Sequence, residues 1–288
     1  MLRAIESSGV TDRAGLGRRW NENSTLAMAA RIEGVNDSAD GEIHMKKIII
    51  SSLIIVALLI GGVGFHYLNR SIGDDSLVNP GESVLRKTGL TVTEITKRAE
   101  NGDARMQYNL AQIYGSGDGV KIDHEKAAHW SLKAAEQGIA DAQTIIGVSY
   151  MTGAGVRLDW RTGFRWLEKA ALQGQSLAQM LLGVAYLGDV SNSPPDFRID
   201  YGAAFYWTLK SAQNGYIPAQ AVISRMYRAG IGTGVDNREA VNWLKKAAQN
   251  GWPESMRELA KAYEEGSMGF EKDLHEAREW QKKADRTK

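Results

Sequence analysis

Residues 104–138 read ARMQYNLAQIYGSGDGVKIDHEKAAHWSLKAAEQG, and variants of this stretch recur along the chain and decide its fold. Its last part, Ala135-Glu-Gln-Gly138, recurs along the chain as Ala-x-x-Gly. The glycines that close this motif are spaced 36, 36, 41 and 36 residues apart: Gly102, Gly138, Gly174, Gly215 and Gly251. A fixed period in this range is typical of proteins whose repeats stack on their neighbours.

Two aromatic residues mark every unit of this repeat. A tyrosine lies 12 residues after each closing glycine, and a tryptophan follows it. Because every unit keeps them, we interpret these residues as part of the core that stacking buries, rather than as ligand-binding groups. The ten residues are Tyr114, Tyr150, Tyr186, Tyr227 and Tyr263, with Trp130, Trp166, Trp207, Trp243 and Trp280.

Each unit is predicted to form two helices, which we call helix A and helix B. In the first unit, helix A covers about 103–114, since Gln107, Leu110 and Tyr114 share one helical face. After a glycine-rich turn, Asp123 is the expected N-cap of helix B, and Gly138 ends that helix in the left-handed conformation. The five units span about 102–137, 138–173, 174–214, 215–250 and 251–288, and residues 91–101 match a lone helix B.

The pattern resembles the Sel1-like repeat family, a relative of the tetratricopeptide repeats. The matching residues are Ala104-x-x-Gln107-Tyr-Asn-Leu110-x-x-x-Tyr114, Gly117-x-Gly119-Val120 and Ala127-Ala-x-Trp130-x-x-Lys133-Ala-Ala-Glu-Gln-Gly138. The resemblance covers about residues 91–288 and implies an all-α, right-handed α-solenoid of five helix pairs that acts as a protein-binding scaffold. The third unit departs from the pattern by five extra residues around 191–196, and the fifth by one in Gly266-Ser-Met-Gly269.

Composition and motifs favour a non-catalytic protein without a metal or cofactor. The 288 residues include 35 basic and 34 acidic side chains, a balance that argues against nucleic-acid binding, and the lack of cysteine excludes thiol chemistry. The G-x-G turns lack the strand and the G-K-[ST] of a phosphate loop, and no H-E-x-x-H is present. Some family members are linked to β-lactam hydrolysis, but without S-x-x-K a β-lactamase-like hydrolase is the weakest alternative.

The N-terminal part of the chain is predicted to lie outside the repeat fold. Residues 48–65 form an uncharged run of 18 residues, from Ile48 to Phe65, directly after Met45-Lys46-Lys47. This layout predicts a transmembrane anchor or a signal peptide over 45–68, with translation able to start at Met45, and positive charges before the run place the solenoid in the periplasm. Residues 1–44 are then disordered or an upstream extension, and 69–90 a linker. Cleavage would instead leave a soluble periplasmic protein.

A partner-binding surface is predicted on helix A, on the side that points away from the core face of that helix. The middle units are apolar there and the end units are mostly polar, as expected of a groove on the concave surface with a charged rim. Packing against adjacent helices A explains the same apolar residues equally well. The candidates are Ile145, Val148, Leu177, Met180, Leu181, Val184, Val222 and Arg225, with the aromatic Tyr216 and Trp252, which share one repeat position.

Other candidate anchors are Trp160, Tyr201 and Phe205 near helix B starts, and the insertion at 191–196. The predicted function is a non-catalytic scaffold that binds another protein, exported or anchored in a bacterial inner membrane. Envelope proteins resembling this one include immunity proteins that neutralise secreted antibacterial toxins, such as type VI secretion phospholipase effectors. Immunity and envelope assembly therefore both stay open as roles.

Overall fold

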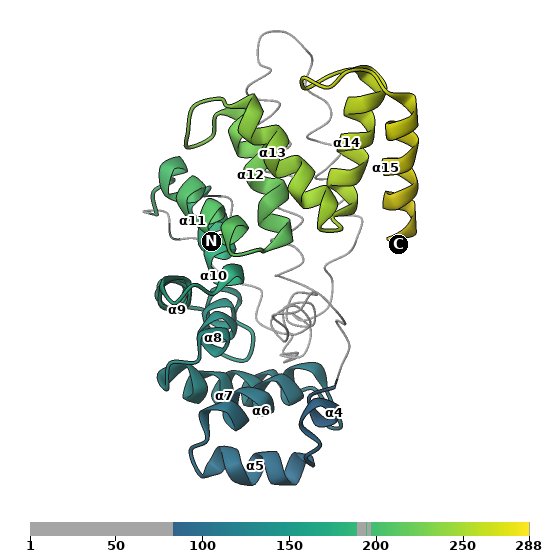
Figure 1. The fold of residues 1–288 in the computed structure, drawn as a ribbon. Coiled ribbons are helices and arrows are strands. Elements are labelled where there is room, and N and C mark those ends of the chain that lie inside the picture. Colours follow the sequence, from purple (N-terminus) through teal and green to yellow (C-terminus); the bar gives the residue numbers. More distant parts are fainter. Residues whose placement is uncertain (1–82, 189–193, 195–196, 288) are drawn as a thin grey trace, which may run out of the picture. The chain divides into compact units, whose positions relative to one another are not determined.

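The computed structural model describes residues 83–188, 194 and 197–287, and every regular element in this part of the chain is an α-helix (Figure 1). The all-α prediction is therefore confirmed for these residues. The extension, the anchor or signal peptide and most of the linker, predicted between residues 1 and 82, lie outside them. The elements are α4 (Val84–Thr88), α5 (Val92–Glu100), α6 (Ala104–Ser116), α7 (His124–Glu136), α8 (Ala140–Thr152), α9 (Trp160–Leu172), α10 (Ser176–Tyr186), α11 (Tyr201–Gln213), α12 (Ile217–Ala229), α13 (Asn237–Gln249), α14 (Pro253–Glu265) and α15 (Leu274–Arg286).

The five predicted helix pairs are α6–α7, α8–α9, α10–α11, α12–α13 and α14–α15, preceded by α5 as the lone helix B. An aspartate side chain caps helix B of each of the five pairs by accepting hydrogen bonds from backbone N–H groups of its first turn; these caps are Asp123, Asp159, Asp200, Asp236 and Asp273. The closing glycines all have positive φ, from +87° at Gly215 to +95° at Gly251, as the left-handed helix stop requires.

The segment predicted as a linker ends in the short helix α4. Ser83 donates a hydrogen bond to Asp118 at 2.7 Å, and the same carboxylate accepts one from the backbone N–H of Leu85 at 3.2 Å. Asp118 therefore ties α4 to the turn after α6, a contact between residues more than 30 positions apart that local sequence patterns do not reveal.

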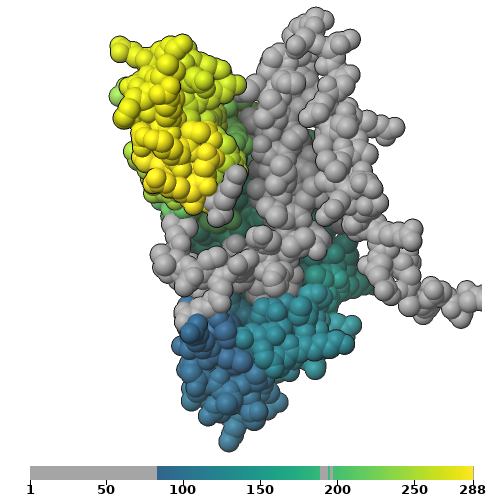
Figure 2. All heavy atoms as spheres, turned by 90° about the vertical axis from the view of Figure 1, so that its right-hand side faces the viewer, coloured from purple at the N-terminus to yellow at the C-terminus, as the bar shows by residue number. Residues whose placement is uncertain are grey.

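Each helix packs chiefly on the helix before it and the helix after it in the chain. Four buried clusters follow one another along the array, and all ten repeat tyrosines and tryptophans contact these clusters while partly buried. At the C-terminal end, α15 packs against α14 and buries only Ala277 and Ala284 within its own length. Much of its remaining surface, shown as yellow spheres in Figure 2, is polar and exposed, as suits a terminal unit.

Buried glutamines link neighbouring units in a series of hydrogen bonds that we call the amide ladder. Each ladder glutamine lies in helix A and donates from Nε2 to an alanine carbonyl in the last turn of the preceding helix B. Its Oε1 accepts a hydrogen bond from the amide of a glutamine or asparagine at the end of its own unit's helix B. The acceptor and donor pairs are Gln107 with Gln137, Gln143 with Gln173, Gln179 with Asn214, and Gln220 with Asn250, at 2.7 to 2.9 Å.

Candidate partner-binding surface

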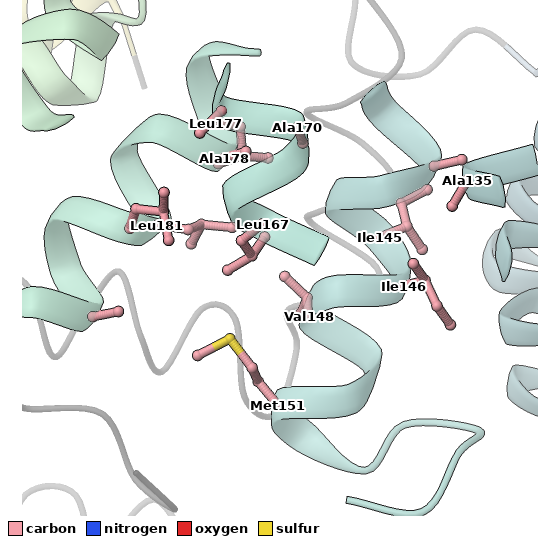
Figure 3. Close-up of a cluster of buried hydrophobic side chains, with 14 of the residues drawn as sticks. Ala135, Ile145, Ile146, Val148, Met151, Leu167, Ala170, Leu177, Ala178 and Leu181 are labelled. Atoms are coloured by element: carbon pink, nitrogen blue, oxygen red, sulfur yellow. The ribbon is translucent and has the colours of Figure 1, made fainter. Parts of the chain in front are cut away.

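The structure buries the apolar side chains predicted to form a groove on helix A. All seven are at most 6% exposed and belong to two core clusters. Figure 3 shows Ile145 and Val148 on α8, with Leu177 and Leu181 on α10, in one cluster that also contains Leu167 of α9. This burial favours packing between neighbouring helices, and docking of a partner on this face stays a prediction. The set is Ile145, Val148, Leu177, Met180, Leu181, Val184 and Val222.

Arg225 lies in a charged contact between the fourth and fifth units. Its Nε is 4.0 Å from Glu258 of α14, and Arg228 Nη1 donates a hydrogen bond to the same carboxylate. The three side chains are 17 to 27% exposed, so solvent screens their attraction only in part. This charged contact therefore connects α12 to α14. It uses helix A positions that are apolar in the middle units and charged in the last two.

Tyr216 and Trp252 begin the helices A of the fourth and fifth units. They are the N-cap residues of α12 and α14, and neither side chain makes a capping hydrogen bond. Tyr216 packs against two of the core clusters, and burial raises the pKa of its phenol to about 12. Trp252 is partly buried. Both positions can therefore be explained by packing at a helix start.

We expect Tyr216 to make the fold sensitive to alkaline pH. Its pKa is higher in the folded state than the ordinary value of 10.0, so its stabilising effect is complete below pH 10 and is lost as the pH rises toward 12. In urea titrations from neutral pH upward, the wild type should lose up to about 2 kcal/mol more stability than Tyr216→Phe over this window. Equal losses in the two proteins would show that the phenol is not held neutral by the fold. Other tyrosines and lysines titrate in both proteins and cancel in the comparison.

The other aromatic candidates mostly pack inside the array. Trp160 is 4% exposed, and its ring lies 4.4 Å from that of Phe197 and 5.2 Å from that of Phe164. Phe205 packs edge-to-face on Tyr227 at 5.1 Å, whereas Tyr201 is 45% exposed. Of the insertion at 191–196, only Pro194 is among the described residues. The adjoining Phe197 joins the aromatic cluster around Trp160.

An exposed row of aliphatic side chains, which we call the loop-edge row, was not predicted from the sequence. Each member directly precedes the aspartate that caps a helix B, and lies beside the glycine that ends helix A in the same unit; a Cβ added to Gly117 would be 2.9 Å from Ile122 Cγ1. The repeated aliphatic-Asp pair, spaced like the repeat itself, was the available signal. The four residues and their exposures are Ile122 (47%), Leu158 (44%), Ile199 (53%) and Val235 (65%).

The described residues contain no group of three or more His, Asp or Glu side chains placed to hold a metal ion. None of helices α4–α15 has the length and apolar character that a membrane crossing requires. The predicted span Ile48–Phe65 and two of the five histidines, His44 and His66, are outside the described part of the chain.

Comparison with known proteins identifies the repeat. The Sel1 repeat model matches residues 104–139, 140–175, 176–216, 217–252 and 253–284, two residues later than the predicted unit starts. A Sel1 repeat protein from Oxalobacter formigenes is 28% identical, with a TM-score of 0.58 over 68% of this chain and 84% of that one. None of the curated proteins matches the chain.

A second solved structure supports the fold alone. It is a protective antigen of uropathogenic Escherichia coli with an SLR fold, 22% identical, with a TM-score of 0.50 over 92% of this chain and 62% of that one. The Sel1 model covers more than half of the chain, and its five matches contain the five helix pairs of the structure, apart from the last residues of α15. The chain therefore belongs to the Sel1 repeat family.

Proposed function

We propose that this protein is a non-catalytic scaffold that binds a partner protein along the loop-edge row. Sel1 repeat proteins are typically protein-binding scaffolds and generally not catalysts. The observation that carries the proposal is the row itself: four aliphatic side chains between 44 and 65% exposed recur at one repeat position in successive units. Exposed apolar side chains that a partner can cover together are a feature of protein interaction sites, and a partner that spans several units would contact these four at the same repeat position.

The proposed location is the cell envelope of a bacterium. The support is the uncharged Ile48–Phe65 run behind Lys46 and Lys47, which favours a single-pass inner-membrane anchor with the repeats in the periplasm. Fractionation of cells tests it, since an anchored chain stays with the inner membrane and a cleaved chain appears in the periplasmic extract. Recovery in the cytoplasm alone would contradict both forms of the proposal.

The double variant Leu158→Ser with Ile199→Ser tests the binding surface. Both side chains are about half exposed, so the fold should survive, whereas about 2–4 kcal/mol of apolar contact with a partner would be lost. The matched control is Leu172→Ser, because Leu172 is 73% exposed but lies at the end of α9, outside the row. The full chain is used to capture partners from the envelope fraction after brief crosslinking.

The proposal predicts partners that the wild type and Leu172→Ser retain and the double variant loses. If the double variant retains every partner of the wild type, the loop-edge row is not the binding surface. If no protein is retained above background by any of the three, the scaffold function itself is contradicted. A secreted toxin among the specific partners, whose toxicity the chain relieves, would favour the immunity role, and a resident envelope protein would favour assembly.

A further inference from the structure

One contact recurs between successive units, where the turn after helix A meets the start of the preceding helix B. In the second unit, a Cβ added to Gly155 would overlap the backbone carbonyl of His124 and lie 2.9 Å from Glu125 N. In the fourth unit, a Cβ on Gly232 would overlap the carbonyl of Tyr201. The turn and the helix start are therefore in close contact at these two junctions.

The third unit fills the same place with an aromatic side chain. It lacks the second turn glycine, and Phe197 packs there against Trp160, the first residue of the preceding helix B, with ring centroids 4.4 Å apart. The fifth unit does neither. Its extra residue is in the turn, and a Cβ on Gly269 would have nothing within 4 Å.

A surface cavity of about 490 Å³ occupies this place at the junction of the fourth and fifth units. The end of α12, the start of α13 and the turn before α15 contribute its walls. Met268 in that turn has φ +56°, a left-handed conformation that is costly for a residue with a side chain. The lining residues are Arg228, Asn237, Arg238, Val241, Asn242, Met268 and Gly269.

The described residues of the lining contain two guanidinium groups and no acidic side chain, although Asn242 Nδ2 donates to the neighbouring Glu239 at 3.1 Å. Arg228 Nη1 donates to Glu258 and lies 3.6 Å from Met268 Sδ, but the buried Arg228 Nε has no hydrogen-bond partner among the described residues. No hydrogen bond or ion pair is found for the exposed Arg238 within that part of the chain. Arg228 Nε is enclosed, so Arg228 contributes its charge there, whereas the exposed guanidinium of Arg238 can donate to an anion in the cavity.

The other junctions serve as internal comparisons, because the repeat aligns their positions. None of them combines the two arginines and two asparagines of the cavity with open space. The corresponding residues are Gly115, His124, Glu125 and His129 at the first junction, Met151, Trp160, Arg161 and Arg165 at the second, and Leu187, Tyr201, Gly202 and Tyr206 at the third. At the second junction, which also has two arginines, Phe197 fills the space.

We propose that this cavity binds a carboxylate side chain of an acidic segment of the partner protein, with an apolar neighbour of that side chain resting on Val241 and Met268. The proposal rests on the proposed scaffold function and names the chemistry of part of the partner. Arginine guanidinium groups bind carboxylates through paired, charge-assisted hydrogen bonds, and the asparagine amides supply further donors. The site lies at the end of the array, where helices A and B are charged rather than apolar.

Arg238→Gln tests this site, because Arg238 is exposed and takes part in no described contact that holds the fold. The probe is a fluorescein-labelled synthetic peptide of repeating glutamate, leucine and glycine, and its glutamine counterpart removes only the charge. Binding is measured by fluorescence anisotropy with the full chain in detergent. The matched control is Arg257→Gln, because Arg257 is an exposed arginine of α14 that pairs with Glu254 at 3.1 Å outside the cavity.

We expect the glutamate peptide to bind about tenfold more tightly than the glutamine peptide, and Arg238→Gln to remove most of that difference. Arg238→Lys should keep part of it, since a lysine retains the charge but not the paired donors. Arg257→Gln should bind like the wild type. Equal affinity for the two peptides, or a wild-type affinity in Arg238→Gln, would overturn the proposal.

Displacement of the peptide by inorganic phosphate, but not by acetate at the same ionic strength, would also overturn it, because the site would then prefer phosphate over a carboxylate. The cavity proposal and the scaffold proposal can fail independently of each other. If peptide selectivity fails while capture still depends on Leu158 and Ile199, only the cavity assignment is lost. If capture does not depend on Leu158 and Ile199 while selectivity holds, the loop-edge row is lost instead.

Discussion

Gly155→Ala is expected to lower the free energy of unfolding by about 2–5 kcal/mol. Two costs combine at this position. The backbone of Gly155 has φ +72°, which a residue with a Cβ adopts at a cost of about 1–2 kcal/mol, and that Cβ would overlap the carbonyl group of His124 at the start of α7. Since backbone cannot rotate away as a side chain can, the turn and α7 would have to separate. Urea unfolding followed by circular dichroism measures the change.

Gly138→Ala is the matched control for this substitution. Gly138 also has a positive φ, +92°, but a Cβ there would have nothing within 4 Å. It therefore carries the conformational cost alone, about 1–2 kcal/mol. Equal losses of unfolding free energy in the two variants would contradict the close contact between the turn and the preceding helix B. They would also remove the explanation for the cavity at the fifth unit, which lacks that contact.

Gln179→Met is expected to cost about 1–3 kcal/mol, although the side chains are similar in size. Gln179 is 4% exposed, its Nε2 donates to Ala171 O at 3.0 Å, and its Oε1 accepts from Asn214 Nδ2 at 2.9 Å. Methionine would remove both hydrogen bonds, each with a net contribution of about 1 kcal/mol. The Ala171 carbonyl would keep the hydrogen bond from Gly174 N, and the exposed Asn214 amide would keep its hydrogen bond to Gly174 O. The loss would be seen in the same urea titration.

Gln213→Met, at the exposed end of α11, provides the comparison for that loss. Gln213 has no hydrogen bond from its side chain to other described residues, so its replacement should change the free energy of unfolding by less than about 0.5 kcal/mol. If Gln179→Met costs no more than this control, the amide ladder does not contribute to the stability of the array. The fifth unit has Met256 at the ladder position, and Thr287 follows its helix B where the other units carry the second amide.

The repeat period and the ends of the helices could be predicted from the sequence because their causes are local. An aspartate before helix B of each pair, and a glycine after helix B of the first four pairs, act within one turn of the chain, and the structure has both. The amide ladder could not be predicted in the same way. Gln107 was recognised as a core-facing residue, but its partner Gln137 is 30 residues away, and only the stacking of the helices brings the two amides together.

The candidate surfaces illustrate a second limit of the sequence. The angular positions of side chains around a single helix separate a core face of helix A from the side that points away from it. They could not show that the opposite side is covered, as it is at Leu181, because that depends on how closely neighbouring units approach. The extra residue in the fifth turn was visible in the sequence. Whether such a turn leaves a cavity or the space is filled, as Phe197 fills it at the second junction, depends on packing.

Site-specific photo-crosslinking in the cell tests the scaffold proposal most directly. A photoreactive phenylalanine analogue would replace Leu158, Ile199 or, as the control, Leu172, one position at a time in the full chain. Each of these side chains is between 44 and 73% exposed, so the probe would face a bound partner or solvent. The account predicts one partner protein crosslinked from both positions 158 and 199 and not from 172. Adducts from 172 alone, or none from either position of the loop-edge row, would contradict it.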